Sequence, residues 1–237
     1  SDVSHELRTP LTTIRMASDV IFSARENFDP TIARSAELLI SQIERFENLL
    51  SDLLEVSRFD AEVATLSLEK VDISILVRRC ADDLGLASKD REAVLRINAP
   101  ATPVIIDADP RRVERIMRNL LANAIDHSEG KPIDVVVEEN ESAVSIGVRD
   151  YGVGLTEQHI ERVFDRFWRA DPSRARTRGG TGLGLSIALE DARLHNGELE
   201  AWGRPGRGSH FVVTLPRNTW ESIEARLIKL QPEDYRA

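Results

Sequence analysis

Across residues 1–60, apolar side chains recur at alternating intervals of three and four residues, the pattern of helices that pack through a narrow stripe. The members of the two stripes are Leu7, Leu11, Ile14, Ser18 and Ile21, and then Ala36, Leu39, Ile43, Phe46, Leu50, Leu53 and Ser57. Between the stripes, Asp29 is suited to an N-cap and Pro30 to the first position of a helix. The pattern predicts a helical hairpin. Because two helices bury little core alone, we expect two copies to form a four-helix bundle.

Beyond residue 70, short runs rich in β-branched or aromatic residues alternate with helical stretches. The expected strands are 104–106, 133–137, 143–148, 199–202 and 210–215, and the expected helices lie near 72–86, 110–127 and 182–196. The turn Asn140-Glu141 between two of these strands indicates a β-hairpin. This part of the chain is therefore expected to be an α+β domain, a mixed sheet with helices on one face.

The 237 residues leave room for two modest domains. We expect a helical domain at 1–60, a connector at 61–70, an α+β domain at 71–217 and a tail at 218–237 with a weak helical pattern. No apolar run approaches the roughly 18–20 residues of a membrane helix. Since helical sequence begins at once, we expect a fragment whose membrane or sensory part lies upstream.

Composition narrows the class of protein. Hydrophobic residues make up 41% of the chain and charged residues 30%, which is typical of a folded globular protein. The formal net charge of -9 argues against a nucleic-acid-binding protein, because such proteins usually show a basic face. The single cysteine, Cys80, excludes an intramolecular disulfide and a cysteine-rich metal site and suits a reducing compartment.

The expected helix 110–127 carries a polar row beside its apolar face. Asn119, Asn123 and His127 follow one another at intervals of four residues and therefore lie on one side of the helix. A buried amide left unpaired costs about 1–3 kcal/mol, so asparagines next to a core need partners. They are either capped or solvated, or a side-chain oxygen ligates Mg²⁺, which prefers oxygen.

Two glycine motifs follow expected strands or precede an expected helix. Asp150-Tyr151-Gly152-Val153-Gly154 offers a carboxylate at a strand end, although this motif taken by itself favours an ordinary turn. Residues 179–185, Gly-Gly-Thr-Gly-Leu-Gly-Leu, open a helix, where free N–H groups bind phosphate. They form neither a P-loop nor a dinucleotide fingerprint, because no Gly-Lys-Ser/Thr follows and no strand precedes. The basic segment 173–178 before them is typical of a lid over a nucleotide or of a solvated loop.

A polar cluster, His5-Glu6-Leu7-Arg8-Thr9-Pro10, interrupts the first apolar stripe. A histidine in such a stripe is usually structural. Here, however, the carboxylate of Glu6 could take a proton from the imidazole, and Pro10 would loosen the helix beside His5.

Together these residues resemble the sensor histidine kinases of bacterial two-component systems over residues 1–216, most of all the actinobacterial osmosensing type. The similar segments are 4–11 for the H-box, 118–127 for the N-box, 150–154 for the G1 box, 163–169 for the F-box, 180–185 for the G2 box and 206–209 for the terminal glycine box. Any one motif is weak, but their order and spacing are specific. The resemblance implies a dimerising helical domain followed by a Bergerat-type α/β-sandwich domain that binds ATP.

The resemblance also implies chemical roles for the helical domain. His5 would accept the phosphoryl group, and Glu6 would draw the proton from the far ring nitrogen. Thr9 would position water in the reverse, phosphatase reaction. Phosphoryl transfer onward to an aspartate of a response regulator receiver domain would follow, in a homodimer that is the cytoplasmic portion of a membrane-anchored protein.

In the second domain, the resemblance makes Asn123 the Mg²⁺ ligand, with Asn119 and His127 near the phosphates of ATP. The other implied nucleotide contacts are Asp150 with the adenine amino group, Gly152 and Gly154 along the base, Gly180, Thr181, Gly182, Leu183 and Gly184 at the phosphates, and Arg169 toward the γ-phosphate. Asp126 departs from the family, because many relatives have lysine there. An ATPase of the same fold, such as a chaperone or gyrase, and a non-catalytic dimer scaffold remain alternatives.

Overall fold

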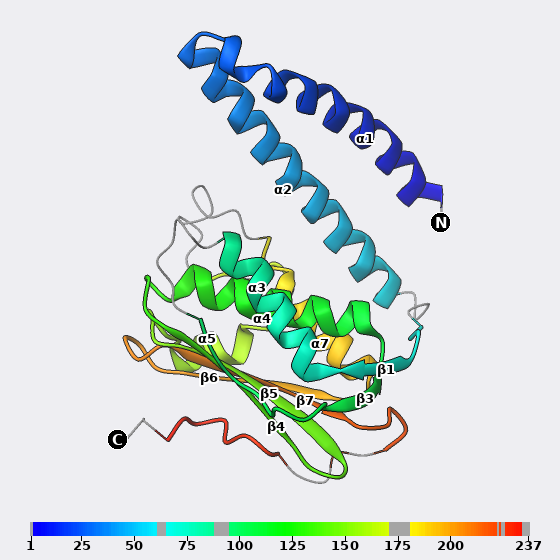
Figure 1. Ribbon diagram of the computed structural model, residues 1–237, viewed down its shortest axis with the longest axis vertical. Helices are drawn as coiled ribbons and strands as arrows, with labels where there is room; N and C mark the ends of the chain where they lie inside the picture. The colour runs from blue at the N-terminus through cyan, green and yellow to red at the C-terminus, as the bar shows by residue number, and fades with distance from the viewer. Residues whose placement is uncertain are drawn as a thin grey trace. The chain divides into compact units, whose positions relative to one another are not determined.

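The computed structural model describes residues 2–60, 65–87, 95–170, 181–221, 223 and 226–233, without the side chains of residues 2–8, 58, 60 and 85–87 (Figure 1). The chain divides into two compact units, Ser1–Val63 and Ala64–Ala237. The first unit is a helical hairpin, and the second is a sheet with helices on one face. Within the described ranges, no helix combines the length and the apolar character that a membrane span requires.

The first unit consists of two long helices, α1 (Asp2–Ser23) and α2 (Pro30–Asp60), with a short 3₁₀ helix, η1 (Arg25–Asn27), between them. The predicted hairpin is therefore confirmed. The carboxylate of Asp29 accepts a hydrogen bond from the N–H of Thr31 at 2.9 Å, and Pro30 is the first residue of α2. Helix α1 continues through Pro10, so this proline does not end it.

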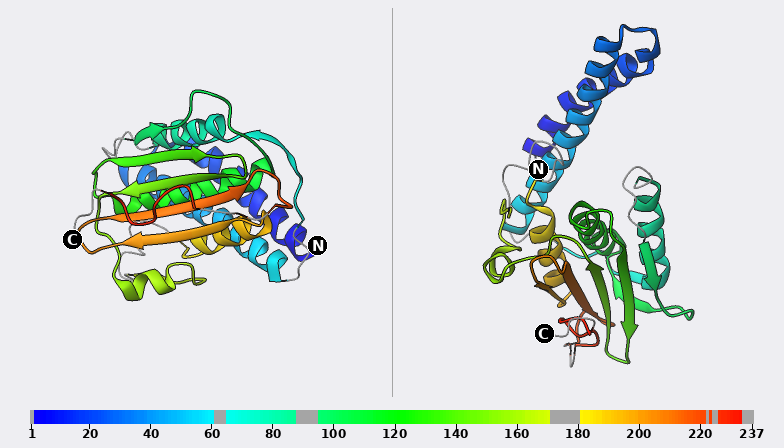
Figure 2. Two further views of the ribbon diagram at one scale, coloured as in Figure 1. Left: turned by 90° about the horizontal axis from the view of Figure 1, so that it is seen from below. Right: turned by 90° about the vertical axis from the view of Figure 1, so that its left-hand side faces the viewer.

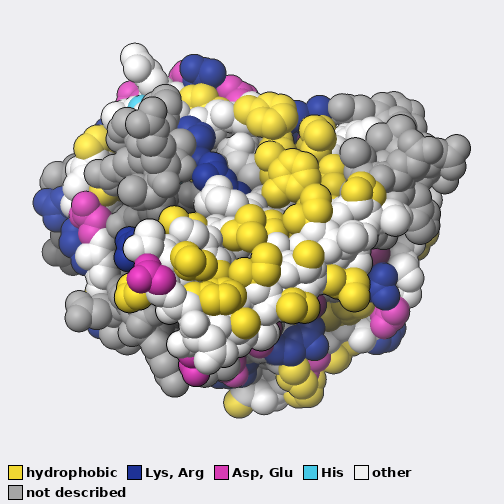
Figure 3. Space-filling model, turned by 90° about the horizontal axis from the view of Figure 1, so that it is seen from above, with side chains coloured by type: hydrophobic (Ala, Val, Ile, Leu, Met, Phe, Trp, Pro, Cys, Tyr) yellow, Lys and Arg dark blue, Asp and Glu magenta, His cyan; other side chains and the backbone are white. Residues whose placement is uncertain are grey.

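Only part of each apolar stripe is covered within one hairpin. Leu11, Ser18, Ala36 and Ile43 are buried. The stripe residues that stay exposed are Ile14, Ile21, Leu39, Phe46 and Leu53. Figure 3 shows exposed hydrophobic side chains gathered in the middle of the face seen from above. A single hairpin therefore leaves an apolar face without cover in the described part of the chain.

The described residues of the second unit form two sheets. Strands β1 (Glu69–Asp72) and β3 (Ile105–Ala108) form an antiparallel pair. The five-stranded sheet has the order β2-β4-β5-β7-β6, and its members are β2 (Leu95–Asn98), β4 (Ile133–Glu139), β5 (Ala143–Asp150), β6 (Glu198–Gly203) and β7 (Ser209–Pro216). Among the strands that the structure describes, only the pairing of β2 with β4 is parallel. This is the mixed sheet that the sequence predicts, including the hairpin of β4 and β5.

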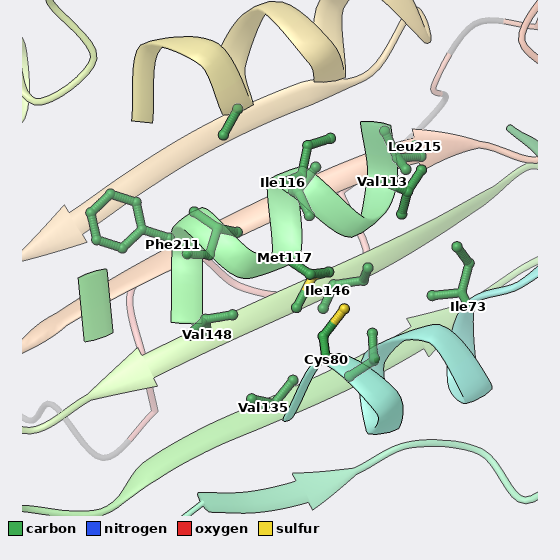
Figure 4. Packing of buried hydrophobic residues seen from close by; sticks show 14 of the residues in the cluster. Ile73, Cys80, Val113, Ile116, Met117, Val135, Ile146, Val148, Phe211 and Leu215 are labelled. Atoms are coloured by element: carbon green, nitrogen blue, oxygen red, sulfur yellow. The ribbon is translucent and has the colours of Figure 1, made fainter. Parts of the chain in front are cut away.

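Three helices cover one face of this sheet: α3 (Ile73–Ala87), α4 (Pro110–His127) and α7 (Gly184–Leu194) (Figure 2). The core lies between them and the sheet, and it includes Met117 on α4, Ile146 on β5 and Phe211 on β7 (Figure 4). Cys80 of α3 is fully buried in this core, and burial raises the pKa of its thiol to about 11. The helices and the sheet thus form the expected α/β sandwich.

Three short elements were not expected from the sequence: β1, β2 and the six-residue helix α5 (Glu157–Arg162). Glu69 and Lys70, expected in the connector, are the first residues of β1 and pair with β3. Thr156 caps α5 by accepting from the N–H of His159 at 3.2 Å. Elements this short carry too few residues for a period to show.

The tail was expected to have a weak helical pattern, and this expectation is wrong for its described residues, which contain no helix. Ile228 is buried beside Gly147 of β5, where a glycine leaves room for it. The Nδ1 of His210 donates to the carbonyl oxygen of Leu230 at 2.8 Å. Contacts with the sheet, rather than a helical period, therefore determine its path.

The start of α4 is tied to the end of α7 through a buried histidine. His195 accepts a hydrogen bond at Nε2 from the N–H of Asp109 at 3.0 Å, so its proton resides on Nδ1, which donates to the carbonyl oxygen of Asp191 at 2.7 Å. The carboxylate of Asp109 caps α4 by accepting from the N–H groups of Arg111 and Arg112. Burial lowers the pKa of His195, despite the nearby carboxylates of Asp191 and Asp109.

We expect the free energy of unfolding to fall as the pH drops below about 6.5, because the unfolded chain then binds a proton that the folded His195 resists. Above that pH the stability is fully retained, and below it the loss reaches up to about 1.4 kcal/mol per pH unit. Urea unfolding at several pH values measures this loss. The His195→Gln variant, whose amide oxygen can still accept from Asp109, should lose less, and equal losses in both chains would contradict the assignment.

Candidate functional site

Helix α4 presents a polar row along the edge of its buried face. The buried residues are Val113, Ile116, Met117, Leu120, Leu121 and Ala124. Asn119 and Asn123 are half-buried at the border of this face, and His127 is exposed at the end of the helix. The amide of Asn123 makes no hydrogen bond with any part of the chain that the structure describes, so its oxygen is available to a ligand.

Asp150 lies at the end of β5, and its carboxylate is buried and held by three donors. The N–H of Gly152 donates to Oδ1 at 2.9 Å, and the N–H of Ser209 donates to Oδ2 at 3.2 Å. The hydroxyl of Ser209 donates to the same Oδ2. Since two carboxylate oxygens offer about four acceptor positions, this arrangement fixes the carboxylate and still leaves it able to bind one more donor.

The turn after Asp150 packs with its backbone directly against two other segments. A Cβ placed on Gly152 would lie 1.8 Å from the carbonyl oxygen of His127, and one placed on Gly154 would lie 1.8 Å from that of Arg204. Gly154 also has a φ of +72°, which side chains other than glycine rarely adopt. Val153 donates from its N–H to His127 at 3.2 Å. These glycines bring Asp150 next to the end of α4.

The N-terminus of α7 lies beside Asn119, the first residue of the same polar row. A Cβ on Gly184, the first residue of α7, would lie 3.0 Å from Oδ1 of Asn119. Leu183 precedes it without a capping side chain, while the hydroxyl of Thr181 accepts from the N–H of Leu183 at 3.2 Å. Gly182 accepts from the N–H of Phe167 at 2.9 Å with a φ of +74°. The first N–H groups of α7 and its positive dipole end therefore form an anion-binding position beside Asn119.

The chain was compared with known families and proteins. Residues 1–62 match the His Kinase A (phospho-acceptor) domain, and residues 108–219 match the Histidine kinase-, DNA gyrase B-, and HSP90-like ATPase. The chain belongs to the sensor histidine kinases of bacterial two-component systems. The first of these matches excludes the chaperone and gyrase alternatives, because it accounts for the helical hairpin in front of the ATPase fold.

Related sensor histidine kinases agree with this assignment. The chain is 53% identical to the sensor histidine kinase MtrB of Mycolicibacterium paratuberculosis and 52% identical to MtrB of Mycobacterium tuberculosis, so it is of the actinobacterial type. Each match covers 98% of this chain but 41% of the relative, so the chain spans about two fifths of their length. Among solved structures, the crystal structure of ShkA full-length in complex with AMPPNP gives a TM-score of 0.76 at 25% identity, over 91% of this chain and 44% of that chain.

Several residues that the sequence assigns to the site are not beside the polar row of α4. Some of them lie outside the residues or side chains that the structure describes, and others lie elsewhere on the chain. The backbone of His5 and Glu6 is helical in α1, but their side chains are not among those described. Thr9 is exposed on the same helix. Gly180 lies outside the described residues, together with the basic segment expected to form a lid. Arg169 lines a separate cavity of about 460 Å³ near α5.

Ser209 is a residue of the candidate site that the sequence did not assign. It lies in the terminal glycine box, 59 residues beyond the carboxylate that it holds. The signal that could have found it is the hydroxyl directly after Gly208, because a strand that begins there pairs with β5 and brings Ser209 to Asp150.

We expect Gly152→Ala to weaken the binding of ATP to this histidine kinase by more than about tenfold, because the added methyl group would meet a backbone oxygen that cannot rotate away. Isothermal titration calorimetry measures the affinity. Gly206→Ala is the matched control: its φ of +71° costs about 1–2 kcal/mol of strain, but no atom lies within 4 Å of the added Cβ. Equal affinities in the two variants would show that the close approach at Gly152 is unimportant for binding.

Proposed function

We propose that this chain phosphorylates itself on His5 with ATP and passes the phosphoryl group to an aspartate of a response regulator receiver domain. The observation that carries the proposal is the placement of two groups along the asparagine row of α4: the N-terminus of α7 lies beside Asn119, and the turn after the buried carboxylate of Asp150 lies beside His127. Residues 1–62, which include His5, match a phospho-acceptor domain, and this match supports His5 as the nucleophile. The activity rests on this combination rather than on any one motif.

Asp150 is proposed to bind the adenine. Its carboxylate is 1% exposed and accepts three hydrogen bonds from the chain, so its orientation is fixed before a ligand arrives. A carboxylate can accept a further hydrogen from the exocyclic amino group of adenine, which guanine lacks at that position. Gly152 and Gly154 would line the base, because their missing side chains leave a flat backbone surface.

The phosphates are proposed to lie between the polar row of α4 and the N-terminus of α7. Gly182 and Gly184, with Thr181 and Leu183, would present N–H groups to the phosphate oxygens, and Asn119 and His127 would contact them from α4. The amide oxygen of Asn123 fits Mg²⁺, a hard ion that typically takes one or two protein oxygens and completes its shell with phosphates and water. Bound there, Mg²⁺ supplies the charge neutralisation that lets a nucleophile approach the γ-phosphate.

His5 would attack the γ-phosphorus through one neutral ring nitrogen. The bond from this nitrogen to phosphorus forms as the bond to the bridging oxygen of ADP breaks, and Glu6 takes the proton from the other ring nitrogen. An imidazole with a pKa near 6.5 is largely neutral at pH 7 and can therefore act as the nucleophile. Arg169 would stabilise the charge on the γ-phosphate.

The partners follow from the helical hairpin. Its exposed apolar residues, such as Ile14, Leu39 and Phe46, are 41–54% exposed in one hairpin, and a second copy would cover them in a four-helix bundle. The receiver domain of the response regulator would dock near His5, and Thr9 would position water for dephosphorylation of that partner. The chain would be the cytoplasmic portion of a membrane-anchored protein.

We expect His5→Gln to abolish labelling of the chain by γ-³²P-ATP without changing its affinity for ATP, because His5 is proposed to act only as acceptor. Asp150→Asn should instead weaken ATP binding by about tenfold, because the new amide donates where adenine also donates. Acid-labile, alkali-stable label on the chain measures phosphoryl transfer to His5, and isothermal titration calorimetry measures the ATP affinity of both variants. Label that persists in His5→Gln would contradict the acceptor assignment, and ATP binding with no label in the parent chain would favour the scaffold alternative.

We expect Thr9→Ala to slow dephosphorylation of the response regulator at least tenfold while it changes autophosphorylation less than about twofold. The two rates are measured separately, with phosphorylated regulator and with labelled ATP. Thr13→Ala, at an exposed threonine one turn further along α1, is the control. Equal losses of both activities in Thr9→Ala would remove the proposed role in positioning water.

A further inference from the structure

Helices α4 and α7 pack antiparallel and touch at two levels. At one level, Gly184 of α7 approaches Asn119 of α4, with the Cβ position 3.0 Å from Oδ1. At the other level, Asp191 of α7 contacts Arg112 and Arg115 of α4. From Gly184 to Asp191 and from Arg112 to Asn119 are seven residues each, two turns of helix. The ion pair and the glycine contact therefore belong to one axial register of the two helices.

The ion pair is buried and uses both oxygens of the carboxylate. Asp191 is 0% exposed, and the side chains of Arg112 and Arg115 are 13% and 30% exposed. Nη1 of Arg112 lies 2.8 Å from Oδ1, while Nε and Nη2 of Arg115 lie 2.7 Å from Oδ2 and Oδ1. Such a two-pronged contact depends strongly on direction, so sliding α7 along α4 would break it.

The position of the ion pair matters because it holds together the two helices of the proposed phosphate site. The N-terminus of α7 would bind the phosphates, and α4 carries Asn119 and Asn123. A buried ion pair adds little net stability compared with apolar residues of similar volume, and its best-attested use is to fix register. The adenine contacts, by contrast, come from Asp150 at the end of β5 and from the turn after it. A shift of α7 would therefore move the phosphate position and leave the base position unchanged.

We propose that Asp191 is a positioning residue that fixes the axial register of α7 on α4 and thereby sets the affinity of the site for the phosphates of ATP. The inference rests on the proposed function, because it takes the nucleotide to bind between these helices. His195 also holds the C-terminal end of α7 against the start of α4, because its ring bonds both to the carbonyl oxygen of Asp191 and to the N–H of Asp109. The register is thus held at the C-terminal end of α7, two turns from Gly184.

The test compares the affinities for Mg-ATP and for adenosine in the full chain, measured by isothermal titration calorimetry. We expect Asp191→Asn to weaken Mg-ATP binding relative to adenosine binding by about tenfold. Glu190→Gln is the control: its ion pair with Arg193 lies on the surface of the same helix, and the ratio should stay within about twofold. Because an unfolded fraction scales both apparent affinities equally, the ratio reports the site even in a destabilised variant.

A second variant separates register from charge. In R112M/R115M/D191L, apolar residues replace the whole ion pair, which often preserves stability. This variant loses one positive charge overall, whereas Asp191→Asn gains one, so an effect of net charge on ATP would have opposite signs. We expect the ratio of the Mg-ATP affinity to the adenosine affinity to fall about tenfold in both variants.

An unchanged ratio in both variants, or opposite changes in the two, would overturn the proposal. If the parent chain binds neither Mg-ATP nor adenosine, the proposed function itself fails, and the two failures are therefore distinguishable. Binding of adenosine with normal affinity in variants that bind Mg-ATP weakly is the expected result.

Discussion

The packing of one face of α4 against the sheet is the interaction on which the second unit depends. Because this face buries six side chains between the sheet and the neighbouring helices, α4 has one rotational setting about its axis. That setting places Asn119 and Asn123 at the border of the core. A rotation that buried them would leave amides without partners at a cost of about 1–3 kcal/mol each. The hydrophobic core therefore decides where the polar chemistry of the site is presented.

Much of this architecture could be predicted from the sequence where an element is long and has clear signals at its ends. The bounds expected for α4, 110–127, agree with the structure because Asp109 caps the helix and Pro110 begins it. The four-residue strands β1 and β2 could not be predicted, since their pairing depends on partners distant in the chain. The path of the tail depends on the space beside Gly147, which no local pattern reveals.

The residues of the candidate site likewise fall into those that could be predicted from the sequence and those that could not. Asp150, Gly152 and Gly154 could be found because they lie together in one short motif. Ser209 could not, since its role depends on a carboxylate 59 residues earlier. The role of Asp191 could not be predicted either. An acidic residue on a helix usually faces solvent, whereas Asp191 is buried and pairs with Arg112, 79 residues earlier in the chain. Local motifs thus reveal the groups that are proposed to bind ligands, while the residues that hold these groups in place are found only in the tertiary structure.

The burial of Cys80 has a practical consequence. Thiol reagents attack the thiolate, and a thiol with a pKa of about 11 and no exposed surface stays protonated and out of reach. The chain therefore behaves toward maleimide dyes as though it contained no cysteine. Two cysteines introduced at exposed positions, one on α2 and one on α3, could carry a fluorescent donor and acceptor without any change to the native core. Energy transfer between the dyes would then measure any change in the distance between the two units when ATP is added.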